Sequence, residues 1–199
     1  MLHICKLCMK QFDYHGILSP PKICTNCFKQ FEVIAKKEKL FQIDVLFLHT
    51  YNDIFKNTLY LFKGCFDYEL RSIFLDRFTH ELKIKYHNYL IVPIPSNKSE
   101  DDKRGYNHVE EIFSFLKLKI IKAIYKNKTF KQSERNKDER KKVINDFSLR
   151  ENIDLKGKNI LIVDDVFTTG SSLYSAINLI KKKEPKKIKA LILAKVINC

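Results

Sequence analysis

The chain has 199 residues, of which 45% are hydrophobic, so it is long enough to bury one substantial core with a small appended module. Its 37 lysines and arginines exceed the 23 acidic residues, and the resulting formal charge of +14 at pH 7 favours polyanions as partners. No apolar run is long enough to cross a bilayer and the first residues lack the apolar core of a signal peptide, so we expect a cytoplasmic protein without a transmembrane segment.

Four of the six cysteines lie near the start of the chain in two Cys-x-x-Cys pairs. Fifteen residues separate the pairs, a spacing typical of four thiolates that bind one zinc ion. Two disulfides or a redox-active pair are the alternatives, but no secretory segment indicates an oxidising compartment. The sequence therefore predicts a zinc ribbon with structural Zn2+, whose ligands are Cys5, Cys8, Cys24 and Cys27.

A short helix and a linker are expected after the cysteines. Apolar residues between positions 28 and 34 have helical spacing, and the charged residues 36–39 that follow indicate a linker. We therefore predict two parts: a zinc ribbon with a linker helix at residues 1–40, and a main domain at residues 41–199.

The main domain alternates strands with helices. Apolar runs predict strands over residues 45–48, 89–93, 120–123, 160–163 and 188–194. Apolar residues at helical spacing predict helices over residues 55–62, 70–78, 109–116 and 173–180. This alternation implies right-handed crossovers and a parallel sheet, with a ligand crevice at the carboxyl ends of the strands.

The most specific segment is NILIVDDVFTTGSS at residues 159–172. We expect a buried strand to end at Asp164 and Asp165, and a helix to begin beyond Gly170. Free N–H groups at a helix start suit a phosphate, which glycine lets the backbone approach. The aspartates can accept hydrogen bonds from sugar hydroxyls or bind Mg2+ through oxygen. The segment thus predicts a site for a phosphorylated ribose, the alternative being an ordinary strand, capping loop and helix. The hydroxyl donors beside the glycine are Thr168, Thr169, Ser171 and Ser172.

This segment resembles the phosphoribosyl pyrophosphate (PRPP) motif of type I phosphoribosyltransferases. The resemblance implies a parallel-sheet, phosphoribosyltransferase-like core that binds PRPP together with Mg2+. The residues that it implies for PRPP binding are Asp164, Asp165, Thr168, Thr169, Gly170, Ser171, Ser172 and Arg104.

A zinc ribbon ahead of a PRPP motif is similar to the ComF family, phosphoribosyltransferase-like proteins associated with competence for DNA uptake. Further matching pieces are Lys63 with Gly64, the VPIP strand at 92–95, the Arg-Gly motif at 104–107, and Thr129 with Gln132. The chain departs from the family at four positions. Tyr106 and His108 stand where Phe and Gln are common, and Arg135 and Val143 replace a leucine and an asparagine.

Residues 96–105 are expected to form a loop after the VPIP strand, where the resemblance implies a pyrophosphate loop. Arg104 is the best candidate there, because its planar guanidinium can hold two phosphate oxygens. For Lys98 and Lys103 we favour a solvated role. The charged residues 126–142 are interpreted either as a mobile loop that closes over the ligand or as solvated surface. The candidate catalytic residues are accordingly Asp164, Asp165, Arg104 and Arg140, with Arg135 as a further cation.

Dense positive charge at residues 126–142 and 181–187 favours nucleic acid, although low-GC coding bias can produce the same lysine-rich composition. The family resemblance implies support for the uptake of single-stranded DNA into the cytoplasm, with DNA-uptake machinery at the inner membrane as a partner. The alternative function is a phosphoribosyltransferase of nucleotide salvage that transfers ribose 5-phosphate to a base or amine. Both functions predict PRPP binding, and turnover is left open.

Overall fold

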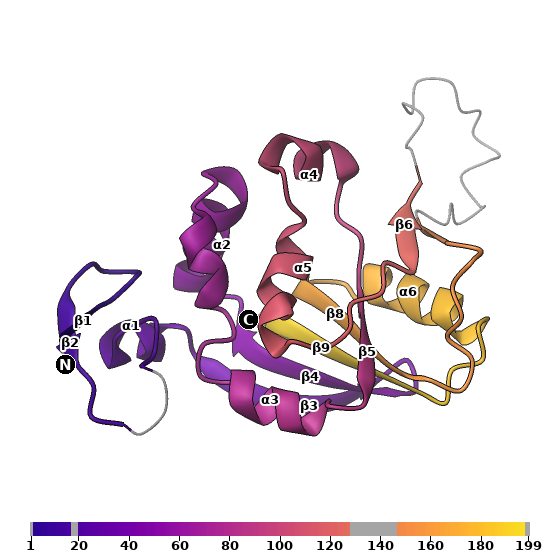
Figure 1. The fold of residues 1–199 in the computed structure, drawn as a ribbon, viewed down its shortest axis with the longest axis horizontal. Helices are drawn as coiled ribbons and strands as arrows, with labels where there is room; N and C mark the ends of the chain where they lie inside the picture. Colours follow the sequence, from indigo (N-terminus) through magenta and orange to yellow (C-terminus); the bar gives the residue numbers. More distant parts are fainter. Residues whose placement is uncertain (1, 17–19, 128–146, 198–199) are drawn as a thin grey trace.

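The computed structural model describes residues 2–16, 20–127 and 147–197. Its centre is a five-stranded sheet in the order β3-β4-β9-β8-β5 (Figure 1). The strands are β3 Val33–Leu40, β4 Ile43–Thr50, β5 Tyr89–Pro93, β8 Asn159–Phe167 and β9 Lys187–Lys195. The last four in this set pair in parallel, whereas β3 runs antiparallel to β4 at one edge. The α/β fold with a parallel-sheet core is confirmed.

Helices cover both faces of the sheet. Successive strand residues point to opposite faces, so each strand places apolar side chains on both. In β8, Leu161 and Val163 belong to one buried cluster, whereas Ile160 and Ile162 belong to the other. The first face packs against α2 Asp53–Gly64, η1 Tyr68–Ser72, α3 Thr79–Lys85, α5 His108–Phe113 and η2 Ser114–Leu116. The second packs against α6 Ser171–Lys181, as its apolar spacing predicts. No helix in the described part of the chain is long and apolar enough to span a membrane.

The charged residues 36–39 belong to β3, so the prediction of a linker there is wrong. β3 and β4 form a hairpin in which Leu40 pairs with Ile43. The two turn residues, Phe41 and Gln42, both have positive φ, which is the backbone of a tight two-residue turn. The lysines are tolerated because β3 is an edge strand with one row of side chains in solvent. They hide the period-2 pattern that would otherwise identify a strand.

Three other predicted elements differ in detail. Residues 70–78 do not form a helix, because hydrogen bonds from Ile73 N to Leu70 O and from Phe78 N to Leu75 O wind them into tighter turns before α3. The strand predicted at 120–123 makes a single bridge to β5, and the hairpin strand β6 Ile124–Lys126 follows it, paired with β7 Phe147–Leu149. The expected loop at 96–105 contains a helix, α4 Lys98–Arg104.

The amino-terminal part consists of a hairpin and a short helix, namely β1 Leu2–Ile4, β2 Gln11–Asp13 and α1 Thr25–Gln30. It packs directly on the main domain, because Ile23 and Phe31 lie in the same buried cluster as Phe55 and Phe74. The Lys22 backbone N–H also donates to Asp76 Oδ2 at 2.7 Å. The division of the chain after residue 40 stays a prediction.

Candidate functional site

The two aspartates lie within β8 rather than after it, so the predicted strand end is wrong by two residues. Asp164 and Val166 are both paired with residues of β9, and the pairing of the two strands continues to Phe167. Because strand side chains alternate, the two carboxylates point to opposite faces of the sheet. Asp165 is buried on the α2 and α5 side, and Asp164 is partly buried on the α6 side. The pair therefore reaches two different neighbourhoods at the carboxyl edge.

Asp165 is held by two side chains from distant segments. Lys63 Nζ, at the end of α2, lies 2.8 Å from Asp165 Oδ2, and His108 Nε2, at the start of α5, lies 3.0 Å from the same oxygen. His108 is buried, whereas Lys63 is about one-third exposed. In the sequence, Lys63 matches the family pattern and His108 departs from it, and neither was predicted to contact Asp165. No local spacing could have joined positions 63, 108 and 165, because the parallel sheet brings them together.

The two carboxylates differ in electrostatics. Burial, the negative charge of Asp165 and a shared hydrogen bond raise the pKa of Asp164 well above its usual range. Burial alone would also raise the pKa of Asp165, but the hydrogen bond from His108 and the positive charge of Lys63 outweigh it, and the pKa is lowered. The site therefore combines one fixed carboxylate with one whose charge is disfavoured until a cation or a hydrogen-bond donor approaches.

The segment after β8 has the predicted glycine turn and helix start, and its role in phosphate binding stays a prediction. Gly170 precedes α6 with φ of +80°, a left-handed conformation that favours glycine. A Cβ at this position would lie 2.8 Å from the Phe167 ring, so glycine also satisfies a steric requirement. The neighbouring hydroxyl side chains are exposed at the helix start, namely Thr168, Thr169, Ser171 and Ser172. Thr169 Oγ1 and Ser171 Oγ are 2.9 Å apart.

Arg104 is engaged with the protein rather than pointing freely into a cavity. Its guanidinium donates to Asp101 Oδ1 at 2.8 Å and to the Lys63 carbonyl at 3.4 Å, and its side chain is almost fully buried. Among the described residues, its Nε has no hydrogen-bond partner. Arg104 thus ties α4 to the end of α2. Its role as a phosphate ligand stays a prediction. Arg135 and Arg140 lie outside the described residues.

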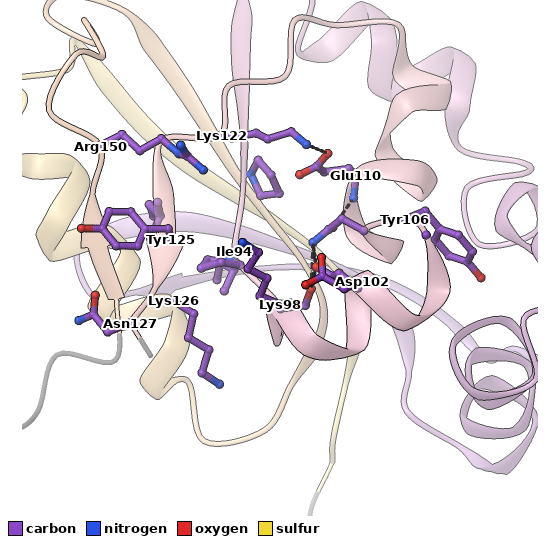
Figure 2. Close-up of a pocket in the computed structure, with 17 residues that line it drawn as sticks. Ile94, Lys98, Asp102, Tyr106, Glu110, Lys122, Tyr125, Lys126, Asn127 and Arg150 are labelled. Carbon is purple, nitrogen blue, oxygen red and sulfur yellow. Dashed lines mark hydrogen bonds and ion pairs between the residues drawn. The ribbon is translucent and has the colours of Figure 1, made fainter. Parts of the chain in front are cut away.

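A cavity of about 840 Å3 opens between the α4–α5 segment and β6 (Figure 2). Basic side chains surround it, namely Lys98, Lys122, Lys126 and Arg150, and Tyr125 lines the β6 wall. Lys122 pairs with Glu110 at 2.7 Å, and the Arg150 guanidinium lies 6.0 Å from the Tyr125 ring centroid. Sequence reasoning missed Tyr125, Lys122 and Arg150, because these residues belong to no motif and are brought to the carboxyl edge by the β6–β7 hairpin.

The four predicted zinc ligands come together. The Sγ atoms of Cys5, Cys8, Cys24 and Cys27 all lie within 4.8 Å of one another, and the Cys8–Cys24 separation is 3.9 Å. Tetrahedral Zn–S bonds of about 2.3 Å place sulfurs about 3.8 Å apart, so this set fits one zinc ion. Burial raises the pKa of Cys5, but hydrogen bonds from backbone amides outweigh it and lower the pKa to about 6. Such amides also stabilise a thiolate ligand.

The chain is similar to several known proteins. Residues 103–198 match the family model described as "Phosphoribosyl transferase domain". A solved hypoxanthine phosphoribosyltransferase from Staphylococcus aureus is similar with a TM-score of 0.40 and 11% identity, over 61% of each chain. The phosphoribosylpyrophosphate synthetase of Mycobacterium smegmatis is similar with a TM-score of 0.35 and 17% identity, over 58% of this chain and 32% of that one.

Two curated relatives cover more of the chain. Competence protein ComFC of Bacillus subtilis (strain 168) is 26% identical over 183 residues, which are 91% of this chain and 72% of the relative. The chain is thus similar to a ComF-family protein over most of its length. Competence protein ComFC of Streptococcus pneumoniae (strain ATCC BAA-255 / R6) is 28% identical over 148 residues, 74% of this chain and 66% of the relative. The ComF resemblance noted in the sequence is thereby confirmed.

Proposed function

We propose that this ComF-like protein acts in natural transformation, where it supports the uptake of single-stranded DNA into the cytoplasm and binds PRPP. The observation that carries the proposal is the match to a competence protein over 91% of the chain. That match is much longer than residues 103–198, so the similarity extends beyond the part that matches the phosphoribosyl transferase domain. The expected partners are single-stranded DNA and the DNA-uptake machinery at the inner membrane.

PRPP binding is proposed at the carboxyl edge of β8. The start of α6, with Gly170 and its neighbouring hydroxyls, would hold the 5-phosphate through N–H and O–H donors. Asp164 would accept ribose hydroxyls or bind Mg2+. Its oxygen donors fit a hard cation, and a cation would relieve the like-charge repulsion that raises its pKa. Lys63 and His108 would hold Asp165 in place beside it.

The bound Mg2+ and PRPP would supply a ribose C1 activated by a pyrophosphate leaving group. Cations placed over that group would offset its growing charge. The segment at 96–105 ends at Arg104, beside the end of α2, and Lys98 lines the large cavity next to it. Arg104 and Arg140 therefore stay the proposed cations of the leaving group, with Asp164 and Asp165 at the ribose.

A genetic experiment tests the function in the cell. Asp164→Asn keeps the side-chain volume and should lower the frequency of transformation by single-stranded or duplex donor DNA to the level of a deletion strain. Growth on nucleobases as the purine or pyrimidine source should be unchanged. Asp154→Asn, an exposed aspartate distant from the acid pair, is the matched control. Normal transformation in the Asp164→Asn strain would contradict the proposal.

One observation favours the alternative, a phosphoribosyltransferase of nucleotide salvage. The 840 Å3 cavity lies beside the proposed pyrophosphate segment and offers the Tyr125 ring and several basic side chains to an acceptor. A salvage enzyme must release pyrophosphate when PRPP is mixed with the correct base or amine. Release with one acceptor and none with single-stranded DNA would favour this alternative.

A further inference from the structure

A second cavity, of about 440 Å3, lies between α2 and α4 on the other side of α4 from the large cavity. One helical stripe of α2 forms its first wall, with residues at i, i+3, i+4, i+7 and i+8, namely Lys56, Leu59, Tyr60, Lys63 and Gly64. Asn97, Glu100 and Arg104 form the opposite wall, and His108 also lines it. We call this cavity the α2–α4 groove. It ends at the residues that hold Asp165.

Tyr60 is the exposed aromatic side chain of the groove. It is 64% exposed, whereas Leu59 and Phe62 on the same helix are buried. The ring lies against Gly64, because a Cβ at Gly64 would be only 2.9 Å from Tyr60 Cε2. Glycine at the end of α2 therefore gives the ring its place on the groove wall. An exposed ring set against the backbone in this way can stack on the face of an unpaired base.

The groove also carries unbalanced positive charge. Lys63 pairs with Asp165, Arg104 pairs with Asp101, and Glu100 pairs with Lys103 outside the groove. Among the described residues, the Lys56 ammonium has no acidic group within ion-pair distance. Lys56 and Tyr60 are neighbours at i and i+4 on the helix surface. A cation and an exposed ring side by side match a phosphate and its base.

We propose that the α2–α4 groove binds single-stranded DNA, with Tyr60 stacking on a base and Lys56 contacting a phosphodiester. This inference rests on the proposed function and assigns a place to its DNA. A single strand is required, because a paired base does not offer its face to a side chain. The groove wall on α2 lies outside residues 103–198, which match the phosphoribosyl transferase domain. A DNA strand bound in the groove would end beside the proposed PRPP site.

Fluorescence anisotropy with a labelled oligothymidylate tests the stacking contact. Tyr60→Ala should weaken binding about tenfold, because base–aromatic stacking contributes about 1–3 kcal/mol. Tyr60→Phe keeps the ring and should bind like the wild type. Gly64→Ala should also weaken binding by displacing the ring, while thermal stability does not fall. Equal affinity in all four proteins would overturn the groove assignment.

The salt dependence tests the phosphate contact. Lys56→Gln should reduce the slope of log affinity against log salt by about 0.7, the loss expected for one phosphate contact with a single strand. Lys182→Gln is the matched control, because it removes the same charge from an exposed lysine in the 181–187 patch, just beyond the end of α6. A loss confined to Lys182→Gln would move DNA binding to that patch and overturn the inference.

Two further outcomes separate this inference from the proposed function. Wild-type protein that binds PRPP but no oligonucleotide would overturn both the groove and the DNA part of the proposed function. Wild-type protein that binds the oligonucleotide, with undiminished affinity in Tyr60→Ala, would overturn the groove alone. If thymidine monophosphate competes as strongly as the oligonucleotide at equal nucleotide concentration, the ligand of the groove is a mononucleotide and the assignment of a DNA strand is overturned.

Discussion

His49 is a buried histidine in an aromatic environment. It lies in β4 with 2% of its surface exposed, and its ring centroid is within 6 Å of those of Phe31, Phe55 and Phe78. Neither ring nitrogen has a hydrogen-bond partner among the described residues. Burial lowers the pKa of His49 from 6.5 to about 4, because a charged imidazole would lose its hydration there.

This environment predicts acid sensitivity of the fold. The unfolded chain binds a proton near pH 6.5 and the folded chain only near pH 4, so the free energy of unfolding should fall as the pH drops through this window. The loss is about 1.4 kcal/mol per pH unit, or about 3 kcal/mol in total. Urea unfolding of the wild type and of His49→Leu at pH 7 and pH 4.5 measures it. The variant should lose less stability, and exposed His80→Leu should behave like the wild type.

The Lys63–Asp165 pair predicts a second effect at the residue scale. Lys63 and His108 both contact the buried Asp165 carboxylate, and Lys63→Gln would remove the first of these contacts. A fully buried pair would cost more, but Lys63 is about one-third exposed, so we expect a loss of about 1–2 kcal/mol in unfolding free energy. Lys56→Gln on the same helix is the control and should change it by less than about 0.5 kcal/mol. Equal stability of both variants would contradict the role of this pair.

At the scale of elements, apolar pattern alone located most of the sheet and α6, because those residues alternate or repeat within a buried core. It failed for α4, whose sequence KSEDDKR has no buried residue. That helix is fixed by polar groups at its ends. The Asn97 side chain accepts from Ser99 N at 3.1 Å, and Gly105 ends the helix with φ of +77°. These capping residues were the available signal.

In the candidate site too, some features could be predicted from the sequence and others could not. The order of residues 159–172 predicted the strand, the left-handed glycine and the helix start, because their geometry is local to one strand and one helix, whereas phosphate binding there stays a prediction. The partners of Asp165 and the enclosure of Arg104 depend on α2, α4 and α5 meeting in space. Sequence alone does not show that Asp101, three residues earlier, accepts a hydrogen bond from the Arg104 guanidinium.

Three glycine-to-alanine variants test the element geometry. Gly170→Ala should be the most destabilising, because it combines positive φ with a Cβ 2.8 Å from the Phe167 ring. A Cβ at Gly105 would have no atom within 4 Å, so Gly105→Ala should lower the free energy of unfolding only by the strain of a left-handed backbone, about 1–2 kcal/mol. Gly64→Ala should not reduce stability, because alanine favours a helix. Thermal unfolding measures this order, and a different order would contradict the assigned backbone roles.

At the scale of the whole molecule, the cysteine module and the main domain share one buried cluster. Ile23, Cys27 and Phe31 pack in it with residues of α2 and the η1–α3 segment. Zinc removal should therefore affect more than the first 30 residues, because metal binding and the folding of such a module are one equilibrium.

Zinc content and thermal unfolding check this prediction. We expect about one zinc per chain, and a fall in melting temperature when a strong chelator removes it. Cys24→Ser should behave like the chelated protein, whereas replacement of exposed Cys65 by Ser should leave both zinc content and stability unchanged. A wild-type protein that is metal-free and melts at the same temperature would contradict the zinc assignment.

Calorimetric titration with PRPP and Mg2+ tests the central claim most directly. Wild-type protein should bind, and Asp164→Asn should lose binding while it unfolds at a similar temperature, because within the described part of the chain Asp164 makes no ion pair of the kind that holds Asp165. Asp154→Asn should bind like the wild type. No binding by the wild type, or undiminished binding by Asp164→Asn, would contradict the assignment of β8 and the start of α6 as a PRPP site.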